Sequence, residues 1–85
     1  MNMDSYTFRF KIEEYTKEVE KDLEDVKKID DIEQQHSKVS FDVSKHKRNL
    51  EELKQGKPED VYYYDNYWPY NLDKYEKEVK KLDDY

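Results

Sequence analysis

The amino-acid sequence predicts a small, mainly α-helical fold: a helical hairpin or coiled-coil-like domain with an aromatic crossover and a short C-terminal helix. Residues 8 to 53 contain no glycine or proline, and their apolar residues recur at spacings of three and four. A glycine and a proline then follow within five residues, which is a helix-stop signal. We expect one small domain over residues 1–85, made of a helical region 8–55, an aromatic crossover 57–70 and a C-terminal helix 71–83.

The helical region divides into two apolar faces that meet at Ile29. The first face consists of Phe8, Ile12, Tyr15, Val19 and Val26. The second consists of Ile32, His36, Val39, Val43, His46, Leu50 and Leu53. The heptad phase slips at Ile29, which predicts a turn within residues 29–37 and an antiparallel pair of helices. A continuous coiled coil with a stammer is the alternative.

The helix-stop signal predicts where the second helix ends. Gly56 follows Leu53, Lys54 and Gln55, and Pro58 comes two residues later. This order is typical of a glycine in the left-handed conformation that closes a helix, followed by a residue that cannot continue it. We therefore expect the helix to end at a left-handed Gly56.

Two short segments also fit β-strands. Residues 6–12 alternate apolar and polar side chains, and so do residues 38–43. If they pair, with residues 61–67 as a third strand, the fold becomes a small α+β domain. The sequence leaves this alternative open.

The segment after Pro58 is rich in aromatic residues and precedes a third helix. Its asparagine, aspartate and Pro69 favour an irregular crossover over a strand. Asn71 is then a suitable N-cap, with Asp73 in the first turn. The apolar face of this helix consists of Leu72, Tyr75, Val79 and Leu82.

Charge and composition limit the classes of partner. The net charge of −6 argues against direct nucleic-acid binding and favours a protein partner with a basic surface. The chain has no cysteine, so it cannot form disulfides or thiolate metal sites. No apolar run is long enough for a membrane span and no signal-peptide pattern begins the sequence, so we expect a cytoplasmic protein with no membrane partner.

A row of acids on the first helix is the first candidate binding site. Glu14, Glu18, Asp22 and Asp25 fall on one stripe beside the apolar face. Carboxylates one turn apart lie about 6 Å from each other, a spacing comparable with that of backbone phosphates. The stripe therefore predicts nucleic-acid mimicry toward a basic cleft. The alternative is a solvated flank whose charge is diluted by neighbouring lysines.

The aromatic crossover is the second candidate binding site. It contributes Tyr62, Tyr63, Tyr64, Tyr67 and Trp68. Tyrosine and tryptophan are enriched at binding hot spots, and the residues between these aromatics are acidic or neutral, which favours a protein over a nucleic-acid base as ligand. A structural role, covering the helices, is the alternative.

Catalysis and metal binding have no motif in this sequence. His36 and His46 lack further ligands at metal-binding spacing, and the single glycine excludes a phosphate-binding loop. We expect no enzyme activity, no metal and no cofactor.

The sequence therefore predicts a non-catalytic inhibitor or modulator that occupies a basic, nucleic-acid-binding surface of a larger protein. The bias toward Lys, Asp, Glu and Tyr, with no alanine, is typical of AT-rich coding and hints at a low-GC bacterium or its phages. Two alternatives remain. One is a homo-oligomeric coiled-coil assembly protein, for example a homodimer. The other is an antitoxin-like neutraliser of a basic toxin.

Overall fold

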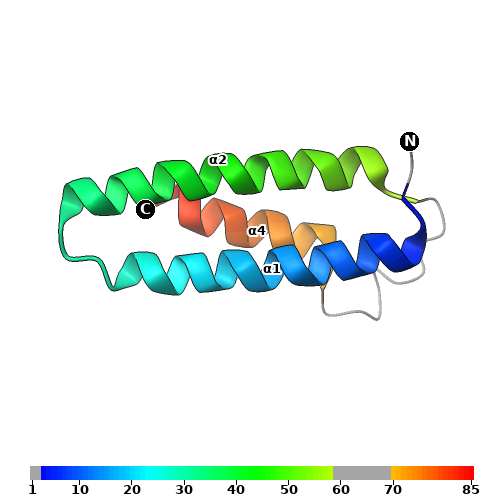
Figure 1. Ribbon diagram of the computed structural model, residues 1–85, viewed down its shortest axis with the longest axis horizontal. Coiled ribbons are helices and arrows are strands. Elements are labelled where there is room, and N and C mark those ends of the chain that lie inside the picture. Colours follow the sequence, from blue (N-terminus) through cyan, green and yellow to red (C-terminus); the bar gives the residue numbers. More distant parts are fainter. Residues whose placement is uncertain (1–2, 59–69) are drawn as a thin grey trace.

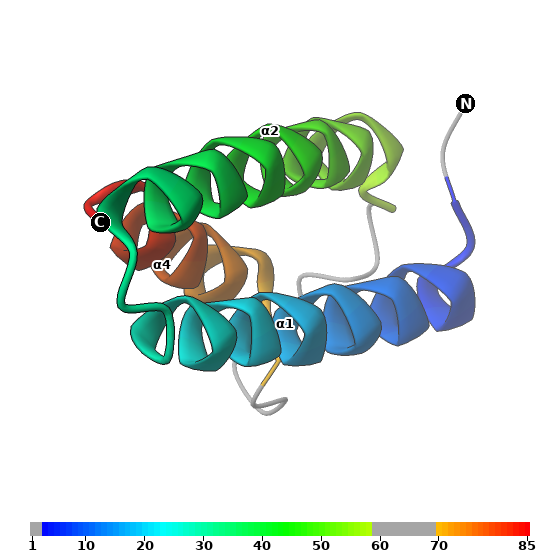
Figure 2. The same ribbon diagram turned by 60° about the vertical axis from the view of Figure 1, so that its left-hand side comes forward.

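A computed structural model describes residues 3–58 and 70–85, and these residues form three helices and no strand (Figure 1). The helices are α1 (Ser5–Lys27), α2 (Ile32–Gly56) and α4 (Leu72–Asp83). α1 and α2 form an antiparallel hairpin, and α4 packs against both of them. Figure 2 shows that α1 and α4 lie on the same side of α2. The mainly α-helical class predicted from the sequence is confirmed.

Each helix of the hairpin has an aspartate as its N-cap. The Asp4 carboxylate accepts a hydrogen bond from the Thr7 backbone N–H at 2.7 Å, which satisfies one of the free N–H groups at the start of α1. Asp31 does the same for α2, accepting from Glu33 and Gln34 at 2.9 and 3.0 Å. The connection between the helices covers residues 28–31 and overlaps only the start of the predicted turn, because residues 32–37 already belong to α2. The phase slip at Ile29 therefore marks a true chain reversal.

α2 ends at the predicted residue but not by the predicted conformation. Gly56 is the last residue of the helix, and it does not have a positive φ. It is buried under Met3, whose backbone N–H donates to the Gly56 carbonyl at 2.9 Å. A Cβ at this position would lie 2.7 Å from Met3 Cε. Gly56 therefore provides space for a close approach, and the prediction of a left-handed cap was wrong.

α4 agrees closely with its sequence signals. The Asn71 side chain accepts from the Lys74 backbone N–H at 2.8 Å, and Lys80 and Lys81 occupy the last turn, where they complement the helix dipole. Tyr75, Val79 and Leu82 are buried. The predicted apolar face therefore packs on the α1–α2 hairpin.

The two segments that also fitted strands are helical. Residues 6–12 lie in α1 and residues 38–43 in α2, so the α+β alternative is wrong for both. The remaining segment of that alternative, 61–67, lies outside the described residues. Both segments are helical because their apolar residues also recur one helical turn apart. In a helix, Phe8 and Ile12 face the same core, and so do Val39 and Val43.

Candidate functional site

The structure does not keep the four predicted acids on one exposed stripe. Glu14 and Glu18 are exposed, Asp25 is half-buried, and Asp22 is buried. Each step of four residues turns about 40° around a helix, so Asp22 is rotated about 80° from Glu14. This rotation brings the Asp22 carboxylate to the side of α1 that faces α2.

The predicted aromatic site cannot be placed in the same way. Its residues, Tyr62, Tyr63, Tyr64, Tyr67 and Trp68, lie outside the described part of the chain.

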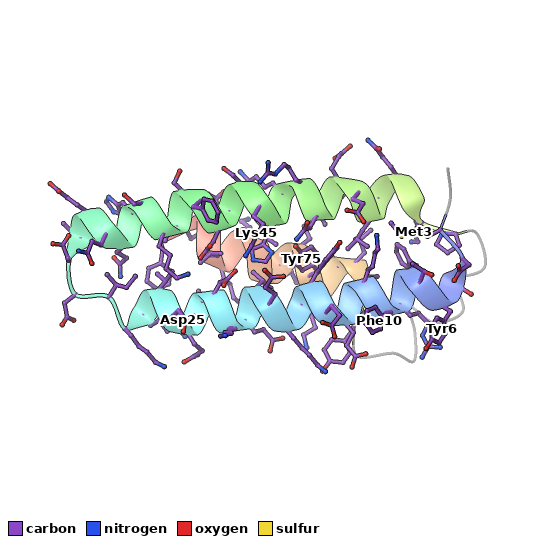
Figure 3. The ribbon with its side chains drawn as sticks, in the orientation of Figure 1. Met3, Tyr6, Phe10, Asp25, Lys45 and Tyr75 are labelled. Atoms are coloured by element: carbon purple, nitrogen blue, oxygen red, sulfur yellow. The ribbon has the colours of Figure 1, made fainter. Side chains whose placement is uncertain are left out.

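A buried chain of hydrogen bonds links one side chain from each helix. We call Asp22, His46 and Tyr75 the polar layer. His46 Nε2 lies 2.7 Å from Asp22 Oδ2, and His46 Nδ1 lies 2.8 Å from the Tyr75 hydroxyl oxygen. His46 and Tyr75 are completely enclosed. Figure 3 shows Tyr75 and the neighbouring Lys45 between α1 and α2.

The geometry of the polar layer fits an imidazole that donates from one ring nitrogen and accepts at the other. Nε2–H donates to the Asp22 carboxylate, and the Tyr75 hydroxyl donates to Nδ1. The Tyr75 hydroxyl oxygen also lies 3.3 Å from the His46 backbone carbonyl oxygen. Both ring nitrogens of His46 and the Tyr75 hydroxyl therefore have hydrogen-bond partners.

An ion pair supports the layer from its solvent side. Lys45 Nζ lies 2.6 Å from Glu18 Oε1 and 3.3 Å from Asp22 Oδ2. Burial raises the pKa of Asp22, but the hydrogen bond from His46 and the charge of Lys45 outweigh it, and the pKa lies below its ordinary value of 3.8. Burial also raises the pKa of Tyr75, so its hydroxyl stays protonated and available as a donor.

The polar layer is a contact between the three helices. The three helices enclose its histidine and tyrosine, so no substrate reaches them in this structure. Within the described residues, no group of three or more histidine, aspartate or glutamate side chains could hold a metal ion. Hydrogen bonds of fixed geometry instead align the three helices in one relative position. The sequence placed His46 on the apolar face but gave no sign of its two partners.

Two exposed aromatic side chains on α1 form a surface that sequence reasoning missed. Tyr6 is 80% exposed and Phe10 is 56% exposed. They are one turn apart, and Glu14 follows one turn further along the same side. Figure 3 shows both aromatic side chains on the side of α1 that faces away from α2. The signal was present in the sequence: once Phe8 and Ile12 occupy the core, helical geometry turns Tyr6 and Phe10 outward.

Comparisons with protein-family models, with curated proteins and with solved structures give no match for this chain. In the described part of the chain, none of the helices has the length and apolar character that crossing a membrane requires.

Proposed function

We propose that the protein is a non-catalytic modulator that binds a basic surface of a larger protein, a surface that would otherwise bind nucleic acid. The observation that carries the proposal is the outer side of α1, where Tyr6, Phe10 and Glu14 are exposed in successive turns. We call these three residues the α1 surface.

The α1 surface combines two features of protein-binding helices. Its aromatic side chains offer a large contact area with few rotatable bonds, as hot-spot residues do. Their spacing of one turn matches the way a helix presents anchors to a groove. A single exposed apolar residue needs no explanation, but an adjacent pair of exposed aromatics costs solubility and is typical of a binding site.

Charge supports a basic partner for the same surface. Glu14 forms no ion pair within the described part of the chain, so its carboxylate is available to a partner cation. Glu18 lies one turn beyond Glu14. It is exposed and forms an ion pair with Lys45. The net charge of −6 steers the protein toward a cationic surface over longer range.

The test is affinity capture with matched charge variants. The immobilised protein is exposed to a lysate of a low-GC bacterium at low salt and then eluted with a salt gradient. We expect a nucleic-acid-binding protein to elute, to be displaced by added DNA or RNA, and to be lost on Glu14→Lys or on the double change Tyr6→Ser with Phe10→Ser. Asp84→Lys makes the same charge change at the far end of the bundle and should leave binding intact.

Two results would contradict the proposal. The first is capture that survives Glu14→Lys and the double aromatic change. The second is a captured protein that nucleic acid does not displace. An antitoxin-like neutraliser would use the same surface, and a basic toxin as the captured protein would identify it.

The coiled-coil alternative needs a different surface from the one predicted. Most of the predicted seam from Ile29 to Leu53 faces α1 and α4, where Val39, Val43, His46 and Leu53 are buried. The prediction was wrong for the start of the seam, because Ile32 and His36 are exposed. A second chain would have to displace one of those helices to pair with it. Any self-association of the closed bundle must therefore involve an outer surface.

A further inference from the structure

The outer side of α2 carries an exposed phenylalanine at its centre. Phe41 is 68% exposed, whereas Val39 and Val43, two residues away on either side, are buried. α1 and α4 both pack on the opposite side of α2, so neither helix covers it (Figure 2). Burial within the bundle does not account for this phenylalanine.

A shallow hollow lies beside Phe41. It has a volume of about 560 Å³ and is lined by His36, Ser37, Ser40, Phe41, Ser44 and Arg48. A second hollow of about 340 Å³ adjoins it across Ser40 and Ser44 and is lined on its far side by Tyr85. The two serines therefore form a low ridge between two aromatic side chains, with room above it for another aromatic ring.

Two charges lie symmetrically on either side of this ridge. Glu33 is two helical turns before Ser40, and Arg48 is two turns after Phe41. Both residues are exposed, and neither forms an ion pair within the residues that the structure describes. An acid at one end and a base at the other make the surface complementary to itself when one copy is reversed.

We propose that the outer side of α2 binds the same side of a second copy of this chain in an antiparallel pair. The two-fold axis passes beside Ser40 and Phe41. Phe41 of each copy then packs over the serine ridge of the other, and Arg48 faces Glu33 across the interface. A two-fold axis makes each of these contacts twice, which is how a small patch gives a specific interface. The pair leaves the α1 surface open for a different partner.

Sedimentation equilibrium of purified protein at low salt tests the pair. Arg48→Glu places two acids opposite each other and should weaken association at least about tenfold. Glu33→Arg should weaken it similarly. The double exchange of Glu33→Arg with Arg48→Glu restores both contacts, and its association constant should return to within about threefold of the unchanged protein. Lys80→Glu makes the same charge change on the exposed side of α4 and should leave association unchanged.

The position of the interface is tested by Phe41→Ser, which should give a monomer with an unchanged circular dichroism spectrum. A wild-type protein that stays monomeric up to about 1 mM would overturn the proposal. So would association that survives Phe41→Ser, or a double exchange that is no tighter than the single reversals. Binding through the α1 surface does not affect these outcomes, because no other protein is present.

Discussion

The middle of this bundle is held together differently from its ends. Toward one end Phe8, Ile12 and Leu53 form a purely apolar layer, and all three are buried. In the middle the polar layer replaces such contacts with two hydrogen bonds of 2.7 and 2.8 Å. Apolar packing is non-directional and permits a helix to slide, whereas hydrogen bonds are satisfied in one alignment only. The ends therefore supply stability, and the middle fixes how the three helices are aligned.

The largest expected effect comes from the apolar end. Leu53→Ala removes a completely enclosed side chain and leaves a cavity in a thin core. We expect a loss of about 3 kcal/mol in the free energy of unfolding, measured by urea denaturation. A second apolar substitution nearby should not restore the lost stability unless the new side chain fills the cavity. A loss below about 1 kcal/mol would mean that this end is not tightly packed.

A smaller loss should follow from breaking the polar layer at one point. His46→Leu leaves the buried Asp22 carboxylate with Lys45 as its remaining partner, and it removes the imidazole from the Tyr75 hydroxyl, which keeps only its contacts with Asn49 and the backbone carbonyl of residue 46. We expect a loss of about 2 kcal/mol.

The polar layer, unlike the apolar end, should be replaceable as a whole. The triple change Asp22→Leu, His46→Leu and Tyr75→Phe removes all three polar groups together, and its stability should return to near that of the unchanged protein. Its amide NMR spectrum should show more than one set of α4 signals, because the alignment is no longer fixed. A triple variant with a single sharp set of signals would contradict the alignment role.

The polar layer should also respond to acid. The pKa of Asp22 is lower in the folded protein than its ordinary 3.8, so the carboxylate contributes stability above pH 3.8. That contribution is lost as the pH falls through the lowered pKa, because the unfolded chain takes up the proton first. Denaturation of the unchanged protein and of Asp22→Asn, from pH 6 down to pH 2.5, should give two stabilities that converge in acid. A constant difference would contradict the assignment.

The smallest effect is expected at Gly56. Alanine there gains helix stability of up to about 1 kcal/mol but must push away the flexible end of Met3. The two effects oppose each other, and Gly56→Ala alone should change the free energy of unfolding by less than about 0.5 kcal/mol. In a Met3→Ala background the conflict disappears, so the same change should stabilise. Equal effects in both backgrounds would show that Met3 does not set the requirement for glycine.

The sequence predicted elements whose signal is local. Asn71, the phase slip at Ile29 and the spacing from Val39 to Leu53 each involve neighbouring residues, and each was interpreted correctly. The Asp22 contact with His46 joins residues 24 positions apart, and helical periodicity does not specify such pairs. Asp22 was therefore assigned to the surface. The prediction for Gly56 was wrong for a similar reason, since its partner Met3 is distant in the sequence and precedes α1.

The enclosed phenol of Tyr75 makes the molecule its own optical reporter. In the folded protein the pKa of Tyr75 lies well above its ordinary value of 10, chiefly because the ring is buried. Ionised tyrosine absorbs at longer wavelength than the neutral form. In an alkaline titration, the rise in absorbance that comes from Tyr75 is expected only when α4 leaves the hairpin. Detachment of a single helix can thus be followed by ultraviolet spectroscopy without any label, with Tyr75→Phe as the blank.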